Sequence, residues 1–327
     1  MLKSKIMKSK TNKGAYTIRA MTRAELKLAV EWAAAEEWNP GLCDADCFYA
    51  ADPNGFLMGF LEGEPIASIS VVKYGNDFGF LGFYMVRPDF RGRGYGWQIW
   101  QAGLDYLKGR TIGLDGVLQQ QDNYVKSGFQ LAHRNIRYEG TATGSENPPL
   151  APPLAKDSEV RLVSLASVPT ETIMEYDSAI FLQARAAFLH CWLASPQHVG
   201  IGLMDGHRLA GYGVLRPCQQ GYKIGPLFAD TPQFAETLFL ALKAHVEPGN
   251  LFYLDVPEAN KEAVALANKH RMTSIFETAR MYRILSGPIS DPMSGPTSDP
   301  TSGPTSDQSL PELPLERIFG ITTFELG

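Results

Sequence analysis

Apolar and polar residues alternate along the chain in a pattern that occurs twice. GFLEGEPIASISVV (residues 59–72) predicts a strand, an acidic-glycine turn and a second strand. GLMDGHRLAGYGVL (residues 202–215) matches it without gaps 143 residues later, and Gly82 and Gly225 stand at the same offset. Features that recur in one order at one spacing favour an internal duplication.

Helix and strand signals follow each of these hairpins. Residues 96–109 and 234–246 carry apolar side chains at helical spacing, and each segment precedes a short strand ending in aspartate, at 112–115 and 251–255. We therefore predict two tandem α+β units. Each has a leading strand, one or two helices, a strand meander, and then helix, strand, helix and strand. The sheets should be mixed, mostly antiparallel and flanked by helices.

Segments of unusual composition mark the boundaries. TATGSENPPLAPPLAKDSE is rich in proline and polar residues, and an imperfect Ser-Gly-Pro-Asp repeat has no residues to build a core. The final LERIFGITTFELG is apolar again and alternates as a strand does. The predicted organisation is a disordered leader at 1–14, a first domain at 15–141, a linker at 142–158, a second domain at 159–285, a disordered repeat at 286–310, and a C-terminal strand docked on a domain at 311–327.

Composition limits the classes of function. A hydrophobic content of 44% is typical of globular protein, and a net charge of −5 argues against nucleic-acid binding. No apolar run has membrane-spanning length, and the basic N-terminus lacks the apolar segment of a secretory signal. The 4 cysteines form neither a disulfide framework nor, with the scattered histidines, a metal site. We expect a cytoplasmic protein with no metal, nucleic-acid or membrane partner.

The stretch VRPDFRGRGYG (residues 86–96) connects the apolar strand FGFLGFYMV to an amphipathic helix. N–H groups at a helix start have no intrahelical partner and bind anions. The glycines allow a phosphate to approach the main chain, and Arg91 and Arg93 add positive charge. Since the spacing is neither that of a P-loop nor that of the dinucleotide-binding fingerprint, we predict a phosphate-binding loop of another kind.

This loop resembles motif A of the GNAT superfamily of acetyl-CoA-dependent N-acetyltransferases, written V-x-P-x-x-[RQ]-x-x-G-x-[GA]. The matching positions are Val86, Pro88, Arg91, Gly94 and Gly96. Downstream, DNYVKSGF resembles the family's second signature and places Tyr124 at its tyrosine. Further segments, among them EEWNPG, FETARMY and FGITTFELG, resemble a tandem bacterial group that pairs an active-looking N-terminal GNAT domain with a divergent C-terminal one.

The resemblance implies that acetyl-CoA is the co-substrate. It implies that the strand before the loop binds the pantetheine arm, that the loop binds the pyrophosphate, and that Tyr124 protonates the departing thiolate. The implied cofactor-binding residues are Tyr84, Met85, Val86, Arg91, Gly92, Arg93, Gly94, Tyr95, Gly96 and Asn123. The alternative for Tyr124 is packing at a helix end.

The group that takes the proton from the amine is not evident. Many members of the family carry a glutamate on the strand before the loop, whereas FGFLGFYMV has no carboxylate. A water relay is the first alternative and Glu37, next to Glu36, is the second. Both glutamates could instead form a solvated helix end.

The candidate acceptor-binding residues are Trp38, Asn39, Asp177 and Arg185. The first two could instead form a packed helix stop, and the last two could pair or pack within a helix. At the offset of 143 residues the second half has lost the arginines and glycines of the loop. We therefore expect acetyl-CoA to bind only the first half, and the second half to form part of the acceptor pocket or a structural surface.

The predicted function is acetyl transfer to a primary amine of a small, amino-acid-like metabolite, directly within a ternary complex. One alternative is an acyl-CoA-binding sensor or interaction protein that has lost catalysis. Another is acetylation of a protein lysine or N-terminus. The oligomeric state is left open between a monomer and a homodimer.

Overall fold

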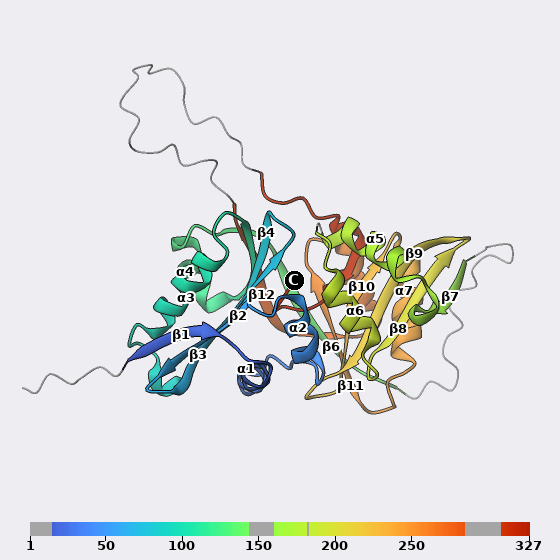
Figure 1. Ribbon diagram of the computed structural model, residues 1–327. Coiled ribbons are helices and arrows are strands. Elements are labelled where there is room, and N and C mark those ends of the chain that lie inside the picture. The colour runs from blue at the N-terminus through green and yellow to red at the C-terminus, as the bar shows by residue number, and fades with distance from the viewer. Residues whose placement is uncertain (1–14, 144–159, 182, 285–308) are drawn as a thin grey trace, which may run out of the picture.

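The computed structural model describes residues 15–143, 160–181, 183–284 and 309–327. The predicted leader, and most of the predicted linker and repeat, lie outside the described residues. The strands form one continuous sheet in the order β1-β2-β3-β4-β5-β12-β6-β11-β10-β9-β8-β7, with β13 beside β10. Helices cover the sheet in both halves of the molecule (Figure 1).

The two halves contain the same succession of elements. The first half comprises β1 (Tyr16–Ala20), α1 (Arg23–Ala35), α2 (Asp44–Ala51), β2 (Phe56–Leu61), β3 (Glu64–Tyr74), β4 (Phe78–Val86), α3 (Tyr95–Tyr106), β5 (Thr111–Val117), α4 (Gln121–Lys126) and β6 (Gln130–Thr141). The second half comprises β7 (Val160–Ser164), α5 (Thr170–Phe181), α6 (Ala186–Ala194), β8 (Val199–Asp205), β9 (Arg208–Pro217), β10 (Tyr222–Ala229), α7 (Pro232–Lys243), β11 (Leu251–Pro257), α8 (Lys261–Lys269) and β12 (Thr273–Arg283). This succession confirms the predicted α+β class.

The last strand of each half lies beside the other half. β12 pairs with β5 of the first half, and β6 pairs with β11 of the second, both antiparallel. β6 and β12 also pair with each other at the centre of the sheet. A buried ion pair joins β6 of the first half to β11 of the second. The Arg137 guanidinium donates to both Asp255 carboxylate oxygens at 2.7 and 2.8 Å. The two halves therefore share one sheet across the predicted domain boundary.

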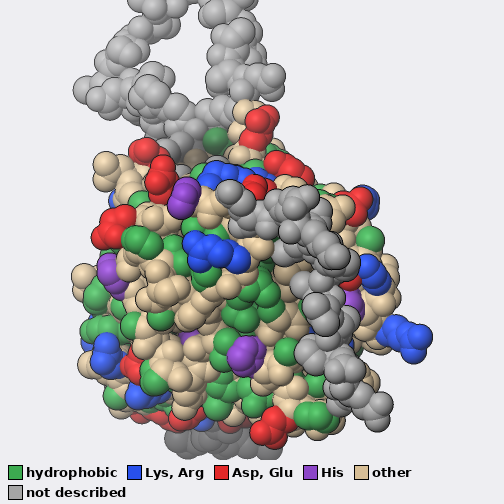
Figure 2. All heavy atoms as spheres, turned by 90° about the vertical axis from the view of Figure 1, so that its right-hand side faces the viewer, with side chains coloured by type: hydrophobic (Ala, Val, Ile, Leu, Met, Phe, Trp, Pro, Cys, Tyr) green, Lys and Arg blue, Asp and Glu red, His purple; other side chains and the backbone are tan. Residues whose placement is uncertain are grey.

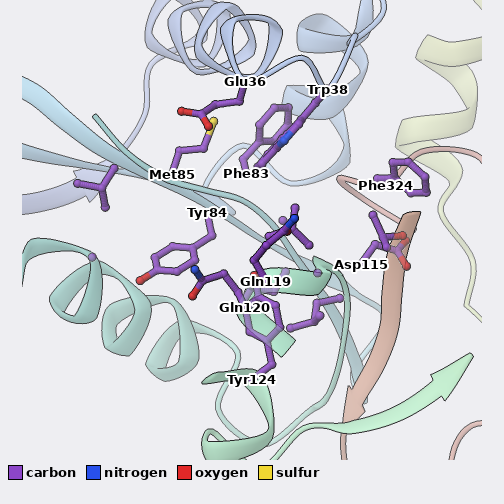
Figure 3. Close-up of a pocket in the computed structure, with 18 of the residues that line it drawn as sticks. Glu36, Trp38, Phe83, Tyr84, Met85, Asp115, Gln119, Gln120, Tyr124 and Phe324 are labelled. Carbon is purple, nitrogen blue, oxygen red and sulfur yellow. The ribbon is translucent and has the colours of Figure 1, made fainter. Parts of the chain in front are cut away.

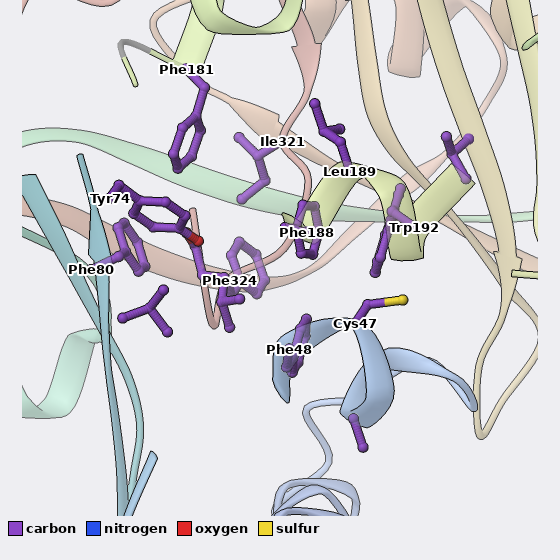
Figure 4. Packing of buried hydrophobic residues seen from close by; sticks show 14 of the residues in the cluster. Cys47, Phe48, Tyr74, Phe80, Phe181, Phe188, Leu189, Trp192, Ile321 and Phe324 are labelled. Atoms are coloured by element: carbon purple, nitrogen blue, oxygen red, sulfur yellow. The ribbon is translucent and has the colours of Figure 1, made fainter. Parts of the chain in front are cut away.

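The largest apolar cluster lies between the halves. It includes Phe48 of α2, Phe188 and Trp192 of α6, and Ile321 and Phe324 near the C-terminus. Figure 4 shows these side chains around the C-terminal segment, between α2 and α6. The C-terminal segment, residues 315–327, therefore packs between the two halves.

The C-terminal strand is shorter than the alternating pattern of residues 315–327 predicts. Only β13 (Ile318–Gly320) is a strand, and it pairs with Leu227 and Phe228 of β10. Every residue from 318 to 327 is buried. Alternation indicates a strand with one buried face, whereas this segment is covered on all sides and leaves the sheet after three residues.

No helix in the described ranges is long and apolar enough to cross a membrane. All 4 cysteines are free thiols. Acidic and basic side chains of the described residues are interspersed on the face that Figure 2 shows, around a centre of uncharged and hydrophobic side chains.

Candidate active site

β4 and β5 separate at the centre of the first half. Their parallel pairing runs from Phe78 with Thr111 to Leu81 with Leu114 and stops there. Beyond this point β4 continues beside β3, whereas β5 continues beside β12. Two splayed strands leave main-chain polar groups for a ligand to pair with.

β4 carries a β-bulge at this opening, because its register with β3 shifts between Gly82 and Met85. Phe83 in the bulge has a φ of 45°, a conformation that few residues other than glycine adopt. The Ser68 hydroxyl supports it by donating to the Phe83 carbonyl at 2.9 Å. Phe83 and Met85 then point toward α1, and Tyr84 points toward α3 (Figure 3).

The start of α3 forms an anion-binding cradle. Gly92 and Gly94 have φ values of 73° and 87°, which only glycine adopts readily. Gly94 is the N-cap of α3, and no side chain caps the first turn. The free N–H groups and the positive end of the helix dipole fit a phosphate group. The residues at the start of α3 therefore fit the pyrophosphate of CoA.

Arg91 stands beside the cradle and already has an anionic partner. Its Nε donates to the Val86 carbonyl at 2.8 Å, and its guanidinium pairs with the Glu36 carboxylate at the end of α1. Both side chains are half-exposed, so the ion pair is weak and can be exchanged for a phosphate at little cost.

A cavity of about 630 Å³ runs along the opening, within the usual size for a small-molecule site. It reaches from the α3 cradle, past the splayed strands, to side chains of β12 and the C-terminal segment. The predicted site residues that line it are Trp38, Tyr84, Met85, Val86, Arg91, Gly92, Gly94, Gly96 and Tyr124.

Tyr124 lies on α4 at the wall of this cavity (Figure 3). Its ring stacks on Trp100 with centroids 5.6 Å apart and packs closely against Gly116 of β5. Burial raises the pKa of Tyr124 well above its ordinary value, so the phenol keeps its proton at neutral pH. A protonated hydroxyl at this place can donate a proton to a leaving group.

Asp115 of β5 also lines the cavity, but its oxygens are engaged. Arg280 donates to both of them at 2.8 and 2.7 Å, and Asn135 donates to one at 2.8 Å. Burial raises the pKa of Asp115, and the Arg280 charge opposes that rise. Among the described residues, no group of three or more His, Cys, Asp or Glu side chains could hold a metal ion.

Three predicted cofactor residues flank the cavity without lining it. Arg93 lies over the Phe90 ring at 5.6 Å, and Asn123 donates to the Gln120 side chain at 2.7 Å. The Tyr95 ring packs on another tyrosine with centroids 4.9 Å apart. Their contact with the cofactor stays a prediction.

Glu37 and Asn39 also lie outside the cavity lining. Glu37 is exposed, so a role as base stays a prediction. Asn39 joins the halves instead: its side chain exchanges hydrogen bonds of 3.0 and 2.9 Å with the Gln220 main chain. Its carbonyl accepts a hydrogen bond from the buried Lys223 ammonium at 3.0 Å.

Asp177 and Arg185 form a fully buried ion pair with hydrogen bonds of 2.8 and 2.7 Å. They do not share a helix, because α5 ends at Phe181 and Arg185 is the N-cap of α6. Arg185 also donates to the Thr322 hydroxyl at 2.9 Å, which holds the C-terminal segment. A direct contact with an acceptor stays a prediction, since neither residue lines the cavity.

The second half lacks the cradle. β10 ends at Ala229 and α7 begins at Pro232, so the loop equivalent to residues 87–94 is shortened to Asp230 and Thr231. The constant offset of 143 residues therefore breaks after the strand. The Thr231 hydroxyl accepts a hydrogen bond from the Phe234 N–H at 3.2 Å and caps α7, so one of the donors that a phosphate would need is already occupied.

Sequence reasoning predicted that the second half would form part of the acceptor pocket, but it named none of the second-half residues that line the cavity. Phe276 and Thr278 of β12 and Phe324 and Glu325 of the C-terminal segment all line it. FETARMY and FGITTFELG contain these residues, and the tandem resemblance drew attention to both segments. No local pattern indicates that they cross to the other half.

Two splayed strands, a glycine-rich helix start and a buried tyrosine at one cavity define an acyltransferase of the GNAT kind. Residues 21–129 match the acetyltransferase (GNAT) family, and residues 173–291 match an acetyltransferase (GNAT) domain. The chain belongs to the GNAT acyltransferase family and carries two GNAT domains in tandem, as predicted.

Individual relatives agree with this assignment. Holothin acyltransferase from Pseudoalteromonas sp. (strain SANK 73390) is 30% identical over 268 residues, which cover 82% of this chain and 88% of that protein. A crystal structure from Pyrococcus horikoshii shares the fold with a TM-score of 0.73 at 21% identity, over 99% of both chains. A tandem GNAT protein from the clavulanic acid biosynthesis pathway has a TM-score of 0.57 at 12% identity, over 82% of this chain and 98% of that one.

Proposed function

We propose that the protein transfers an acetyl group from acetyl-CoA to a primary amine of a small molecule, directly within a ternary complex. The observation that carries this proposal is one continuous cavity that joins the α3 cradle to Tyr124 and to a wall built by the second half. One half binds the donor, and both halves enclose the acceptor.

The donor end is built for acetyl-CoA, which supplies the activated acyl group when bound. The α3 N-terminus and Arg91 hold the pyrophosphate. The free edge of β4 beyond Gly82 pairs with the pantetheine arm, and Tyr124 holds the proton that the leaving sulfur requires. The chemistry needs no metal ion, because orientation and hydrogen bonding lower the barrier.

The acceptor end favours a small molecule over a protein chain. Trp38, Phe276 and Phe324 give it aromatic walls, and β12 and the C-terminal segment close it from the side of the second half. The relative from Pseudoalteromonas is named for acyl transfer to holothin. Holothin is therefore the first acceptor to assay, beside a panel of primary amines and amino acids.

The test is release of CoA thiol from acetyl-CoA in the presence of each acceptor, with the acetylated product identified by mass spectrometry. We expect turnover with at least one small amine and none without an acceptor. Saturable CoA binding without turnover across the panel would favour an acyl-CoA sensor. Turnover with lysine peptides but not with small amines would favour a protein acetyltransferase.

A further inference from the structure

The C-terminal segment occupies the second half's counterpart of the cofactor cleft. β10 and β11 pair in parallel only from Tyr222 to Ile224 and then separate, as β4 and β5 do. β13 fills that opening through its pairing with β10, and the Ile321 N–H donates to the Asp255 carbonyl of β11 at 2.9 Å. The second half thus binds a piece of its own chain where the first half has an open cavity.

The same segment then crosses to the first half. The Ser70 hydroxyl donates to the Glu325 carbonyl at 3.3 Å, and the Tyr74 hydroxyl donates to the Leu326 carbonyl at 3.1 Å. Together with the hydrogen bond from Arg185 to the Thr322 hydroxyl, these bonds fix the segment at both ends. Phe324 and Glu325 are thereby held at the wall of the cavity.

The geometry points to Glu325 as the group that accepts the proton of the acceptor amine, with the Thr278 hydroxyl as a hydrogen-bond partner of the same amine. This inference rests on the proposed function and assigns the base that the β4 sequence lacks. The acceptor subsite then belongs mainly to the second half, through β12 and the C-terminal segment.

The side chain of Glu325 places a carboxylate at the wall of the cavity. Glu325 is only 3% exposed to solvent, and it lines the cavity. Within the described part of the chain, no side chain or main-chain N–H donates a hydrogen bond to its carboxylate. Asp115, the other buried carboxylate of the cavity, has its oxygens engaged by Arg280 and Asn135. A proton can therefore be accepted at Glu325 without breaking an ion pair.

Thr278 is a second, independent sign of a polar ligand. It is 2% exposed, and its Oγ1 has no hydrogen-bond partner among the described residues. Its position on β12, opposite Val117 of β5, places it at the cavity wall. A buried hydroxyl without a partner costs free energy that a bound ligand can restore.

The charges around Glu325 come from four elements. Burial raises the pKa of the Glu325 carboxyl, and Asp44 of α2 adds to the rise. Lys223 of β10, Arg137 of β6 and Arg216 of β9 oppose it. A carboxylate with a raised pKa retains a captured proton more readily than an exposed one, as a general base should near neutral pH.

The residues of the site account for every bond and proton in the transfer. The amine nitrogen uses its lone pair to form a bond to the acyl carbon while the carbon–sulfur bond breaks. The proton lost by nitrogen goes to the Glu325 carboxylate, and sulfur receives a proton from Tyr124. Glu325 then releases its proton to solvent, and Tyr124 takes one up.

The walls indicate the class of amine. The Phe276 and Phe324 rings have centroids 5.9 Å apart, and the Arg137 guanidinium lies over Phe324 at 4.8 Å. Trp38 lines the same cavity from the first half. Aromatic side chains on several sides favour an amine on a flat, apolar framework over a highly charged polyamine.

The experiment compares Glu325→Gln, Thr278→Val and the control Glu316→Gln, an exposed glutamate of the same segment. Steady-state kinetics use acetyl-CoA and the amine of highest kcat/KM from the panel. We expect Glu325→Gln to lower kcat about 100-fold or more, with CoA affinity and melting temperature unchanged. We expect Thr278→Val to raise the KM for the amine about tenfold, within the range for one buried hydrogen bond. Glu316→Gln should match the wild type.

The pH profile separates catalysis from folding. An ionised Glu325 is required, so kcat of the wild type should fall as pH drops through the Glu325 pKa, at a pH above that of an ordinary glutamate, about 4.3. Glu325→Gln should lose this acid limb, and Glu325→Asp should retain it at reduced kcat. A wild-type enzyme with no thiol release for any amine overturns the proposed function as well. A Glu325→Gln enzyme with wild-type kcat and acid limb overturns only the inference, and so does a wild-type profile without that limb.

Discussion

The Glu325 main chain lies directly against Gly82 of β4, because a Cβ added to Gly82 would stand 2.3 Å from the Glu325 carbonyl oxygen. A Cβ added to Gly225, the equivalent glycine of the second half, would stand 2.7 and 2.8 Å from the Ile321 and Thr322 carbonyl oxygens. One C-terminal segment therefore packs on equivalent glycines of both halves. Glycine is needed there because the obstacle is main chain, which cannot rotate away.

Gly82→Ala should displace the C-terminal segment. Overpacking of this kind costs about 1–3 kcal/mol of unfolding free energy, and the shift of Glu325 should lower kcat while CoA affinity is retained. Denaturant unfolding measures the loss of stability, and hydrogen exchange of the amides of residues 318–327 measures the displacement of the segment. Steady-state kinetics measure kcat. In the control Gly79→Ala the new methyl meets mainly the end of the Leu107 side chain, which can move, so the segment should stay protected. Wild-type exchange in Gly82→Ala would contradict the prediction.

Arg91 and Glu36 should have opposite effects on CoA affinity. Arg91→Ala removes a charged phosphate contact and should weaken CoA binding about tenfold. Glu36→Gln removes the competing carboxylate and should strengthen it by about two- to fivefold, the range of an exposed ion pair. Calorimetric titration with CoA at low and high salt measures both. Arg161→Ala is the control, since Arg161 is an exposed residue of β7 outside the cavity lining. Equal losses for both arginines would contradict the assignment of Arg91.

Tyr124→Phe should lower kcat about 100-fold through loss of the general acid. Stability should hardly change, because the ring keeps its stacking on Trp100 and the hydroxyl has no hydrogen-bond partner among the described residues. Because the acid must be protonated, ionisation of Tyr124 should lower the rate as pH rises through the Tyr124 pKa. Since burial raises that pKa, the wild-type rate should show no alkaline fall from this group below about pH 10. Single-turnover rates across pH test this, and unchanged turnover in Tyr124→Phe would remove Tyr124 from the mechanism.

The donor side of the site could be predicted from the sequence because its chemistry is local. The phosphate cradle needs glycines, arginines and a helix start within residues 86–96, and periodicity alone places them between a strand and a helix. The hairpin repeat likewise predicted the duplicated α+β fold. Local steric and hydrogen-bonding rules sufficed for both.

The acceptor side could not be predicted because it depends on contacts between distant segments. Thr278 and Glu325 reach the first half only through the exchanged strand β12 and the segment after β13. Asp177 and Arg185 were candidate acceptor-binding residues on one apparent helix, yet they lie on either side of a helix break, are buried and hold Thr322. An eight-residue spacing fits either arrangement, and only packing decides between them.

Asp177→Asn should destabilise the protein by about 3–5 kcal/mol, because it leaves the buried Arg185 charge without its counter-charge. The control is Asp205→Asn, whose pair with Arg208 is exposed, and it should change stability by less than about 0.5 kcal/mol. Urea titration measures both. If the pair binds the acceptor instead, Asp177→Asn should raise the KM for the amine with little loss of stability.

The exchange of β6 and β12 predicts that the two halves unfold together. β6 lies between β12 and β11, so loss of either half removes a neighbouring strand from the other. The buried Arg137–Asp255 pair couples the halves further, because breaking it leaves a buried charge without its partner in each half. Calorimetry should show one transition whose calorimetric and van't Hoff enthalpies agree. Asp255→Asn should lower its midpoint without splitting it, whereas independent halves would give two transitions, only one of them shifted by the substitution.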